Sequence, residues 1–376
     1  MSTRHTHRLT LIGAVVCALL ASALTNVVPA GARQRTLAGA PAASSAAILG
    51  ANGPIAFERF ATKHEDDRTA QIFVRSPSGA VRQITHFRGG AFNPAWSPDG
   101  ARIAFDRWFV AQRQPDQILT MNADGSDARP LTSGCTAANC LADDSPSYSP
   151  DGSQIAFVRL YKPLVEDRPS AADLMLVPAA GGAPRVLRHF AGDPIPLQPA
   201  WSPDGTRLVF ALETAKQPTK QTDVLGALNV LDVAGGAMTQ ITPIALGASD
   251  PDWSPDGSRI VFNSQGGHSP FVYVVRPDGS GLRRITRRTR VFSLNPSDPP
   301  VALVAQFQPS WSPDGRQILF TNEPKPCSGH HRDSCSRDPK DAQPRNVFAM
   351  NVDGTGVRRL TRSPRFEGQP AWARAS

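Results

Sequence analysis

The chain is built from short runs of apolar residues that are separated by tight-turn sequences. Five of these runs share one pattern, in which a branched aliphatic residue is followed by Ala, Val or Leu and then by Phe: Ile103–Phe105, Ile155–Phe157, Leu208–Phe210, Ile260–Phe262 and Ile318–Phe320. Short runs of this kind, bounded by Pro, Asp and Gly, are typical of β-strands and too short for helices. The pattern therefore predicts an all-β fold.

Each of these runs follows the motif Trp-Ser-Pro-Asp-Gly, in which Tyr replaces Trp once. The motif lies at 96–100, 148–152, 201–205, 253–257 and 311–315. Pro sets φ to about −65°, Asp accepts hydrogen bonds from the local backbone, and Gly tolerates positive φ, so the motif suits a tight turn. We therefore expect a hairpin, with the aromatic residue on the strand before the turn.

Two further strands are expected after each hairpin. The third strands are expected at 117–121, 173–177, 228–231, 271–275 and 346–350, and the fourth strands are expected to end at Thr132, Leu187, Thr242, Thr286 and Thr361. Four antiparallel strands that recur every 52 to 58 residues are typical of the blades of a β-propeller.

The two ends of the chain supply the parts of one more blade. Residues 369–373 match a first strand, and residues 53–85 match the remaining strands of a blade that lacks its first. Pairing of these segments would close the ring and remove the exposed edges of an open array. The sequence therefore predicts a six-bladed β-propeller, four antiparallel strands per blade, closed by pairing 369–373 with the half-blade at 53–85.

The repeated Pro-x-Trp-Ser-Pro-Asp-Gly motif and the apolar strand after it resemble the WD-like repeat of the TolB-type β-propeller family. The resemblance covers about residues 52–373. It implies a propeller that offers the mouth of its channel to a peptide or a partner protein. The α/β domain that precedes the propeller in TolB is not expected here, because only residues 33–51 separate the expected export signal from the first strand.

The N-terminus has the features of an export signal. Arg4 and Arg8 precede an apolar stretch at 9–24, and Ala30-Gly31-Ala32 offers a cleavage site. A retained anchor is the alternative, but the stretch is short for a membrane span, and no later segment approaches that length. We expect an exported monomer (extracellular, cell-wall associated or periplasmic), with a signal peptide at 1–32, a flexible linker at 33–51 and the propeller at 52–376.

The charge of the chain gives little indication of a partner. The net charge of +8 falls to +6 when Arg4 and Arg8 are removed with the signal. One dense basic cluster remains, formed by Arg283, Arg284, Arg287, Arg288 and Arg290. It lacks the interleaved aromatic residues of a single-strand nucleic-acid site, so nucleic acid is not an expected partner. Contact with anionic envelope polymers, or a solvated blade edge, accounts for the cluster.

Four cysteines follow the expected cleavage site, as the local pairs Cys135 with Cys140 and Cys327 with Cys335. An even number of cysteines in an exported chain favours two disulfides. The alternative is a zinc site formed by Cys327, His330, His331 and Cys335. Because thiols oxidise in that compartment, we favour the disulfides and expect no metal or cofactor.

Blade topology sorts the loops onto two faces. The tight turns lie on one face, here called the turn face, and the long connections lie on the other, the long-loop face. The long-loop face carries both cysteine pairs and six histidines, which are His64, His86, His189, His268, His330 and His331. Variable loops on a rigid scaffold are a common place for binding, so we expect the site on this face, around the channel mouth.

One polar residue precedes the repeated Pro in every blade. These six residues are Asn93, Ser145, Gln198, Asp250, Gln308 and Gln369. Equivalent positions in six blades should ring the channel mouth, where the side chains either bind a partner or hydrogen-bond to neighbouring inner strands. The Asp of each turn and the Trp or Tyr before it are assigned structural roles.

The sequence contains no sign of a hydrolase. Propeller-bearing serine peptidases add a domain with a Gly-x-Ser-x-Gly elbow, and this chain has neither. A metal-dependent polysaccharide lyase would use histidines such as His64, His86, His189 and His268, but these show no repeated ligand spacing. The sequence therefore predicts a non-catalytic binding propeller with a protein or peptide partner. The alternative is a lyase-like enzyme or a carbohydrate-binding propeller.

Overall fold

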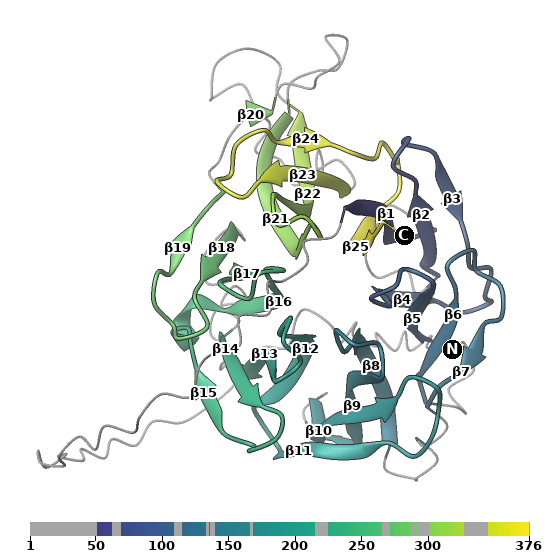
Figure 1. Ribbon diagram of the computed structural model, residues 1–376, viewed down its shortest axis with the longest axis vertical. Coiled ribbons are helices and arrows are strands. Elements are labelled where there is room, and N and C mark those ends of the chain that lie inside the picture. Colours follow the sequence, from purple (N-terminus) through teal and green to yellow (C-terminus); the bar gives the residue numbers. More distant parts are fainter. Residues whose placement is uncertain are drawn as a thin grey trace, which may run out of the picture.

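A computed structural model describes residues 51–61, 69–108, 115–132, 135, 140–165, 168–214, 225–264, 271–286, 290–291, 301–326 and 345–375. These residues form six sheets that are arranged radially around a central channel (Figure 1). Five sheets have four strands and one has five. The prediction of a six-bladed, all-β propeller is confirmed.

Blades 1 to 3 contain the first eleven strands and the last one. Blade 1 consists of β25 (Glu367–Arg374), β1 (Asn52–Arg59), β2 (Gln71–Arg75) and β3 (Val81–Gln83). Blade 2 consists of β4 (Ala91–Trp96), β5 (Arg102–Arg107), β6 (Gln117–Asn122) and β7 (Arg129–Pro130). Blade 3 consists of β8 (Cys140–Tyr148), β9 (Gln154–Val165), β10 (Arg168–Pro178) and β11 (Arg185–Ala191).

Blades 4 to 6 contain the remaining strands. Blade 4 consists of β12 (Ile195–Trp201), β13 (Arg207–Thr214), β14 (Leu225–Asp232) and β15 (Met238–Gln240). A short 3-10 helix, η1 (Ile244–Leu246), leads to blade 5, which consists of β16 (Ala248–Trp253), β17 (Ile260–Ser264), β18 (Phe271–Val275) and β19 (Arg283–Arg284). Blade 6 consists of β20 (Arg290–Val291), β21 (Val301–Trp311), β22 (Gln317–Pro326), β23 (Asn346–Asn351) and β24 (Arg358–Arg359).

The ring is closed by strands from opposite ends of the chain. β25 pairs antiparallel with β1, and Trp372 lies opposite Ile55 in this pairing. Figure 1 shows β25 beside β1, with the C-terminus next to them. The predicted closure through 369–373 is therefore confirmed.

The repeated motif forms the same turn in each of its five copies. In blade 2 the Ser97 hydroxyl donates to the Asp99 carboxylate and accepts from the backbone N–H of Arg102, while Gly100 takes a positive φ of 70°. In blade 3 the hydrogen bond from the Ser149 hydroxyl, with those from Ser153, lowers the pKa of Asp151 to about 2. The repeated Asp therefore has the structural role predicted for it.

The hydrophobic core lies between neighbouring blades. The Phe of every second strand is fully buried, and these residues are Phe57, Phe105, Phe157, Phe210, Phe262 and Phe320. Phe210 of blade 4 packs in one cluster with Leu174 and Leu176 of blade 3. Each blade therefore depends on its neighbour for burial, as expected of stacked repeats.

Five blades end their fourth strand with the same hydrogen bond. The hydroxyls of Thr85, Thr132, Thr242, Thr286 and Thr361 accept from third-strand N–H groups at 2.8 to 3.1 Å. Because the hydroxyl takes the N–H that a longer fourth strand would use, the outer strand stops after two or three residues. Within the described part of the chain, no helix has the length and apolar character needed to cross a membrane.

Candidate functional site

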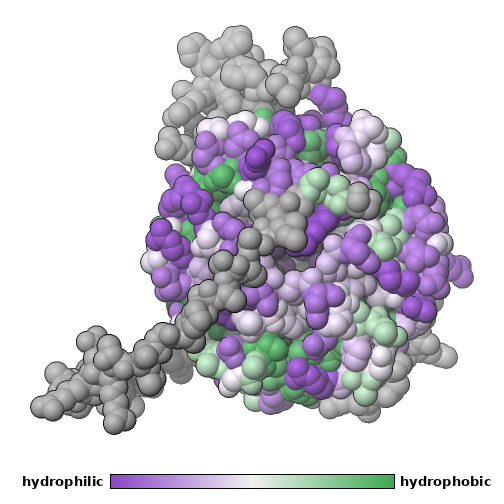
Figure 2. Space-filling model, in the orientation of Figure 1, coloured by the Kyte–Doolittle hydropathy of each residue, from purple (hydrophilic) through white to green (hydrophobic). Residues whose placement is uncertain are grey.

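The central channel is the candidate functional site. It encloses about 340 Å³ and is lined by the inner strand of every blade, from the polar residue before the repeated Pro to the Pro of the turn. In the face shown in Figure 2, the residues around the centre of the ring are mostly of intermediate hydropathy, and strongly hydrophilic residues gather nearer the rim. The order of the lining residues along each inner strand distinguishes two ends of the channel, here called the polar end, at the residue before the repeated Pro, and the turn end, at the aromatic residue and the turn.

The polar end contains all six residues that the sequence analysis placed at the channel mouth: Asn93, Ser145, Gln198, Asp250, Gln308 and Gln369. Seven non-glycine residues have positive φ in the described chain, and six of them are these, with φ between 42° and 55°. Each lies at a break in the pairing of the first and second strands. The repeat therefore builds a β-bulge into every inner strand, and such bulges re-aim side chains.

The strained backbone at these bulges is supported by the preceding blade. A left-handed conformation costs a non-glycine residue about 1 kcal/mol or more. The N–H of Asn93 donates to Glu58 Oε1 of blade 1 at 2.6 Å, and the N–H of Gln308 donates to Asn263 Oδ1 of blade 5 at 3.1 Å. Ser145, Asp250 and Gln369 find side-chain acceptors in the same way. Hydrogen bonding between neighbouring blades, the structural alternative for this ring, is therefore present.

Side chains of different blades meet across the polar end. Asp250 Oδ1 accepts from Gln198 Nε2 at 2.7 Å and from Gln369 Nε2 at 3.4 Å, which links blades 4, 5 and 1. On the other side, Asn93 Nδ2 donates to the carboxylates of Asp106 and Asp144 at 2.8 and 3.1 Å. The polar end thus contains two hydrogen-bonded groups of side chains, and each group links more than one blade.

Two carboxyl groups beside these side chains, those of Asp106 and Asp144, have raised pKa values. Burial, together with the charges of Asp144 and Glu58, raises the pKa of Asp106 well above its usual value. Burial also raises the pKa of Asp144. In the channel wall, burial raises the pKa of Asp252 to about 6, although the backbone N–H of Trp311 donates to this carboxylate at 2.7 Å.

The turn end is lined by the aromatic residue and the Pro of each repeat. Trp201, Trp253 and Trp311 are buried, in agreement with packing between blades. The Trp201 indole N–H donates to the Ser147 carbonyl of blade 3 at 3.2 Å. The indole N–H groups of Trp253 and Trp311 have no hydrogen-bond partner among the described residues. Both nitrogens are buried, so they lie within the packing of the blades and not on the open surface of the channel.

Sequence reasoning missed this wall of blades 5 and 6. A signal was present at the position between the repeated Pro and the aromatic residue, where four other blades have Ala or Ser at Ala95, Ser147, Ala200 and Ala371, and blade 6 has Ser310. Blade 5 has Asp252 there. A single carboxylate at an otherwise small, neutral position marks this side of the channel.

Comparisons with known proteins agree with this architecture. A family model described as the TolB beta propeller domain matches residues 168–305. TolB from Acinetobacter baumannii superposes with a TM-score of 0.60 at 16% identity, covering 85% of this chain and 66% of that one. A putative TolB from Agrobacterium tumefaciens gives 0.55 at 22%, covering 85% and 91%. The propeller is therefore similar to those of TolB-type proteins.

Relatives found by sequence share less than 30% identity with the chain, and most of them match over only part of their own length. An uncharacterised protein of Agrobacterium fabrum is 27% identical over 267 residues, 71% of this chain and 74% of its own length. A TolB homologue of Chlorobium luteolum is 29% identical over 128 residues, and an uncharacterised peptidase of Bacillus subtilis is 24% identical over 198. The chain spans only 24% and 29% of those two proteins, so these similarities concern a part of each.

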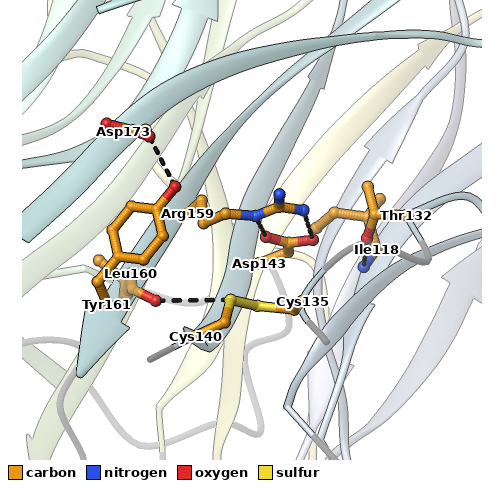
Figure 3. Close-up of a disulfide and its surroundings, with 9 residues drawn as sticks. All are labelled: Ile118, Thr132, Cys135, Cys140, Asp143, Arg159, Leu160, Tyr161 and Asp173. Carbon is orange, nitrogen blue, oxygen red and sulfur yellow. Dashed lines mark hydrogen bonds and ion pairs between the residues drawn. A yellow bond between two sulfur atoms is a disulfide. The ribbon is translucent and has the colours of Figure 1, made fainter. Parts of the chain in front are cut away.

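The propeller carries one of the two predicted disulfides within its described residues. Cys135 and Cys140 are bonded, with their Cα atoms 5.2 Å apart (Figure 3). Asp143 lies beside them and forms a two-fold ion pair with Arg159, at 2.6 and 2.8 Å. Cys135, Cys140 and Asp143 are the described group with metal-ligand spacing, but both sulfurs are oxidised. Cys327, Cys335, His330 and His331 lie outside the described residues.

Two of the histidines considered for a lyase site are described, His86 and His189. His189 lies in outer strand β11, and its Nδ1 is 2.6 Å from the Asp173 carboxylate, which also accepts from the Tyr161 hydroxyl at 2.7 Å. His86 is hydrogen-bonded to Gln83, just after β3 of another blade. These two side chains lie on the outer strands of different blades and not among the residues that line the channel, whereas His64 and His268 lie outside the described residues.

Proposed function

We propose that the protein is an exported, non-catalytic binding propeller that takes up an extended segment of a protein or peptide partner in its central channel. The observation that carries the proposal is the lining of the channel, which combines a polar ring, an aromatic and proline rim, and a volume of about 340 Å³. Sites of this kind have apolar walls with a few placed polar groups.

The wall of blades 5 and 6 supports a peptide as the bound group. The indole nitrogens of Trp253 and Trp311 are buried, so a polar group of this wall that a ligand can reach is the Asp252 side chain, which lines the channel. The carboxylate of Asp252 is an acceptor for backbone N–H groups or for an amine. A polypeptide offers backbone N–H donors along one edge, which a purely apolar ligand lacks.

The TolB likeness supports binding rather than catalysis, because the resemblance implies a propeller that presents its channel to a partner. Export is supported by the signal-like features of residues 1–32 and by the Cys135–Cys140 disulfide, since disulfides persist in oxidising compartments. The long-loop face remains a predicted second contact surface, because much of it lies outside the described residues.

Site-specific photo-crosslinking in the exporting cell tests this proposal. A photoreactive residue at Ala95 samples the channel wall, and one at Ile244, which is 42% exposed in η1, samples the long-loop face as a matched control. We expect a protein adduct from Ala95. An adduct from Ile244 alone would move the site to the long-loop face, and failure at both positions would contradict a protein partner.

Metal analysis of the purified chain separates the binder from the lyase alternative. We expect no stoichiometric divalent metal and no cleavage of acidic polysaccharides. Stoichiometric metal together with such cleavage would overturn the non-catalytic assignment.

A further inference from the structure

Strand β11 differs from the outer strand of every other blade. It contains seven residues, whereas β3 and β15 contain three and β7, β19 and β24 contain two. Figure 1 shows β11 running along the outer rim of the ring. Among the described strands its one partner is β10, on the inner side. The outward backbone N–H and C=O groups of β11 therefore form a long open edge.

The cause of this length is one residue. Arg188 lies opposite Leu174, at the position where the other five blades have the capping Thr. Without the hydroxyl, pairing with β10 continues through His189, Phe190 and Ala191. The open edge is therefore built by the loss of the cap in blade 3.

The edge has a distinct charge. Arg185, Arg188 and His189 are the charged or titratable residues of β11, and the strand contains no acidic residue. Asp173 pairs with His189 from the neighbouring strand and is buried. Val186 is 51% exposed, so the edge combines a basic character with an apolar contact point.

We propose that β11 is a docking edge that adds an acidic, extended segment of a partner protein as a fifth strand of blade 3. Strand addition uses main-chain hydrogen bonds for affinity and side chains for specificity. Seven residues span about 23 Å at about 3.3 Å per residue, which is the length of an ordinary strand. This surface lies on the outer rim and is independent of the channel.

The positive charge of the edge favours an acidic segment over pairing with a second copy of the chain. Antiparallel pairing of two β11 strands about Arg188 would place two guanidinium groups opposite each other, and directly opposed like charges destabilise a strand pair. An acidic segment instead places carboxylates opposite Arg185 and Arg188. The same arginines that discourage self-association thus favour an acidic partner.

The probe for this proposal is a peptide of alternating Thr and Glu that matches β11 in length, with a Thr and Lys peptide as control. Backbone amide exchange of the full exported chain is measured with each peptide. We expect the acidic peptide to slow exchange in residues 185–191 and to bind about fivefold more tightly than the basic one, with a difference that shrinks at high salt.

Charge reversal makes the test specific. The variant R185E/R188E should invert the preference, so that the Lys peptide binds more tightly. The matched variant R82E/R129E reverses charges on the short outer strands β3 and β7 and should leave the preference for the acidic peptide unchanged. Thermal unfolding checks that each variant is folded. Equal binding of the two peptides, protection elsewhere than β11, or dimerisation through β11 in sedimentation would each overturn the proposal.

Discussion

Blades 2 and 3 share one repeat, and three of the equivalent positions at which they differ distinguish their edges and ends. Blade 2 has Thr132 as the cap of its fourth strand, and blade 3 has Arg188. The second difference lies in the register between the first and second strands, two residues before the bulge. There, blade 2 has Ala91 opposite Arg107, whereas blade 3 has Asp143 opposite Arg159. Next to the buried Phe, blade 2 has Asp106 and blade 3 has Val158. The comparison teaches that the repeat sets the blade core, while individual residues set its edges and ends.

The largest expected effect concerns what the two blades share. Phe105→Ala and Phe157→Ala should each lower the free energy of unfolding by about 3–5 kcal/mol, because both side chains are fully buried. Denaturant titration of both variants measures this. Losses that differ by more than about 2 kcal/mol would mean that the two cores are not equivalent.

The next effect is confined to blade 3. Asp143→Ala leaves the Arg159 guanidinium buried without its two-fold partner and should cost about 3 kcal/mol. Replacing both residues with Leu should recover most of this loss, since blade 4 has Pro196 and Leu212 at the same pair. If the double variant is as unstable as the single one, the ion pair contributes more than charge compensation. Denaturant titration again provides the readout.

A smaller effect tests the cap. Thr132→Val leaves the buried N–H of Ile118 without its acceptor and should cost about 1–2 kcal/mol, whereas Thr132→Ser should cost less. In blade 3, Arg188→Thr should supply the missing cap and accelerate amide exchange in residues 189–191. Unchanged exchange there would show that another feature sets the length of β11.

The smallest effect is the pH dependence contributed by Asp106. Its pKa in the folded protein lies above the unfolded value, so its favourable contribution is complete at low pH and is lost as the pH rises through the folded pKa. Asp106→Asn keeps an acceptor for Ser145 and should flatten that part of the profile. Unfolding free energies of both proteins, measured from about pH 4 to about pH 8, test the sign of this dependence.

The regular parts of the fold were predictable because each repeat carries its own turn and strands. Closure through 369–373 followed from the missing strand at the other end, and the ring from Asn93 to Gln369 followed from its fixed position before Pro. The support of that ring was not predictable, because its acceptors come from the preceding blade, as Glu58 does for Asn93.

The open edge of blade 3 was present in the sequence but not interpretable from it. The fourth strand ended on Val186-Leu187 where the others ended on Thr. The meaning of that Thr depends on a hydrogen bond to a strand fourteen residues earlier, such as Thr132 to Ile118. Likewise, the unpartnered indoles of Trp253 and Trp311 depend on how neighbouring blades pack.

The pairing of β25 with β1 has a consequence for the order of biogenesis. β1 leaves the ribosome before the other strands of the ring, and β25 leaves it after all of them. Blade 1 therefore lacks its inner strand until residue 374 has been translated, and the ring cannot close before that point. A ring that closes through the pairing of its first and last strands therefore stays open until the other blades have been synthesised.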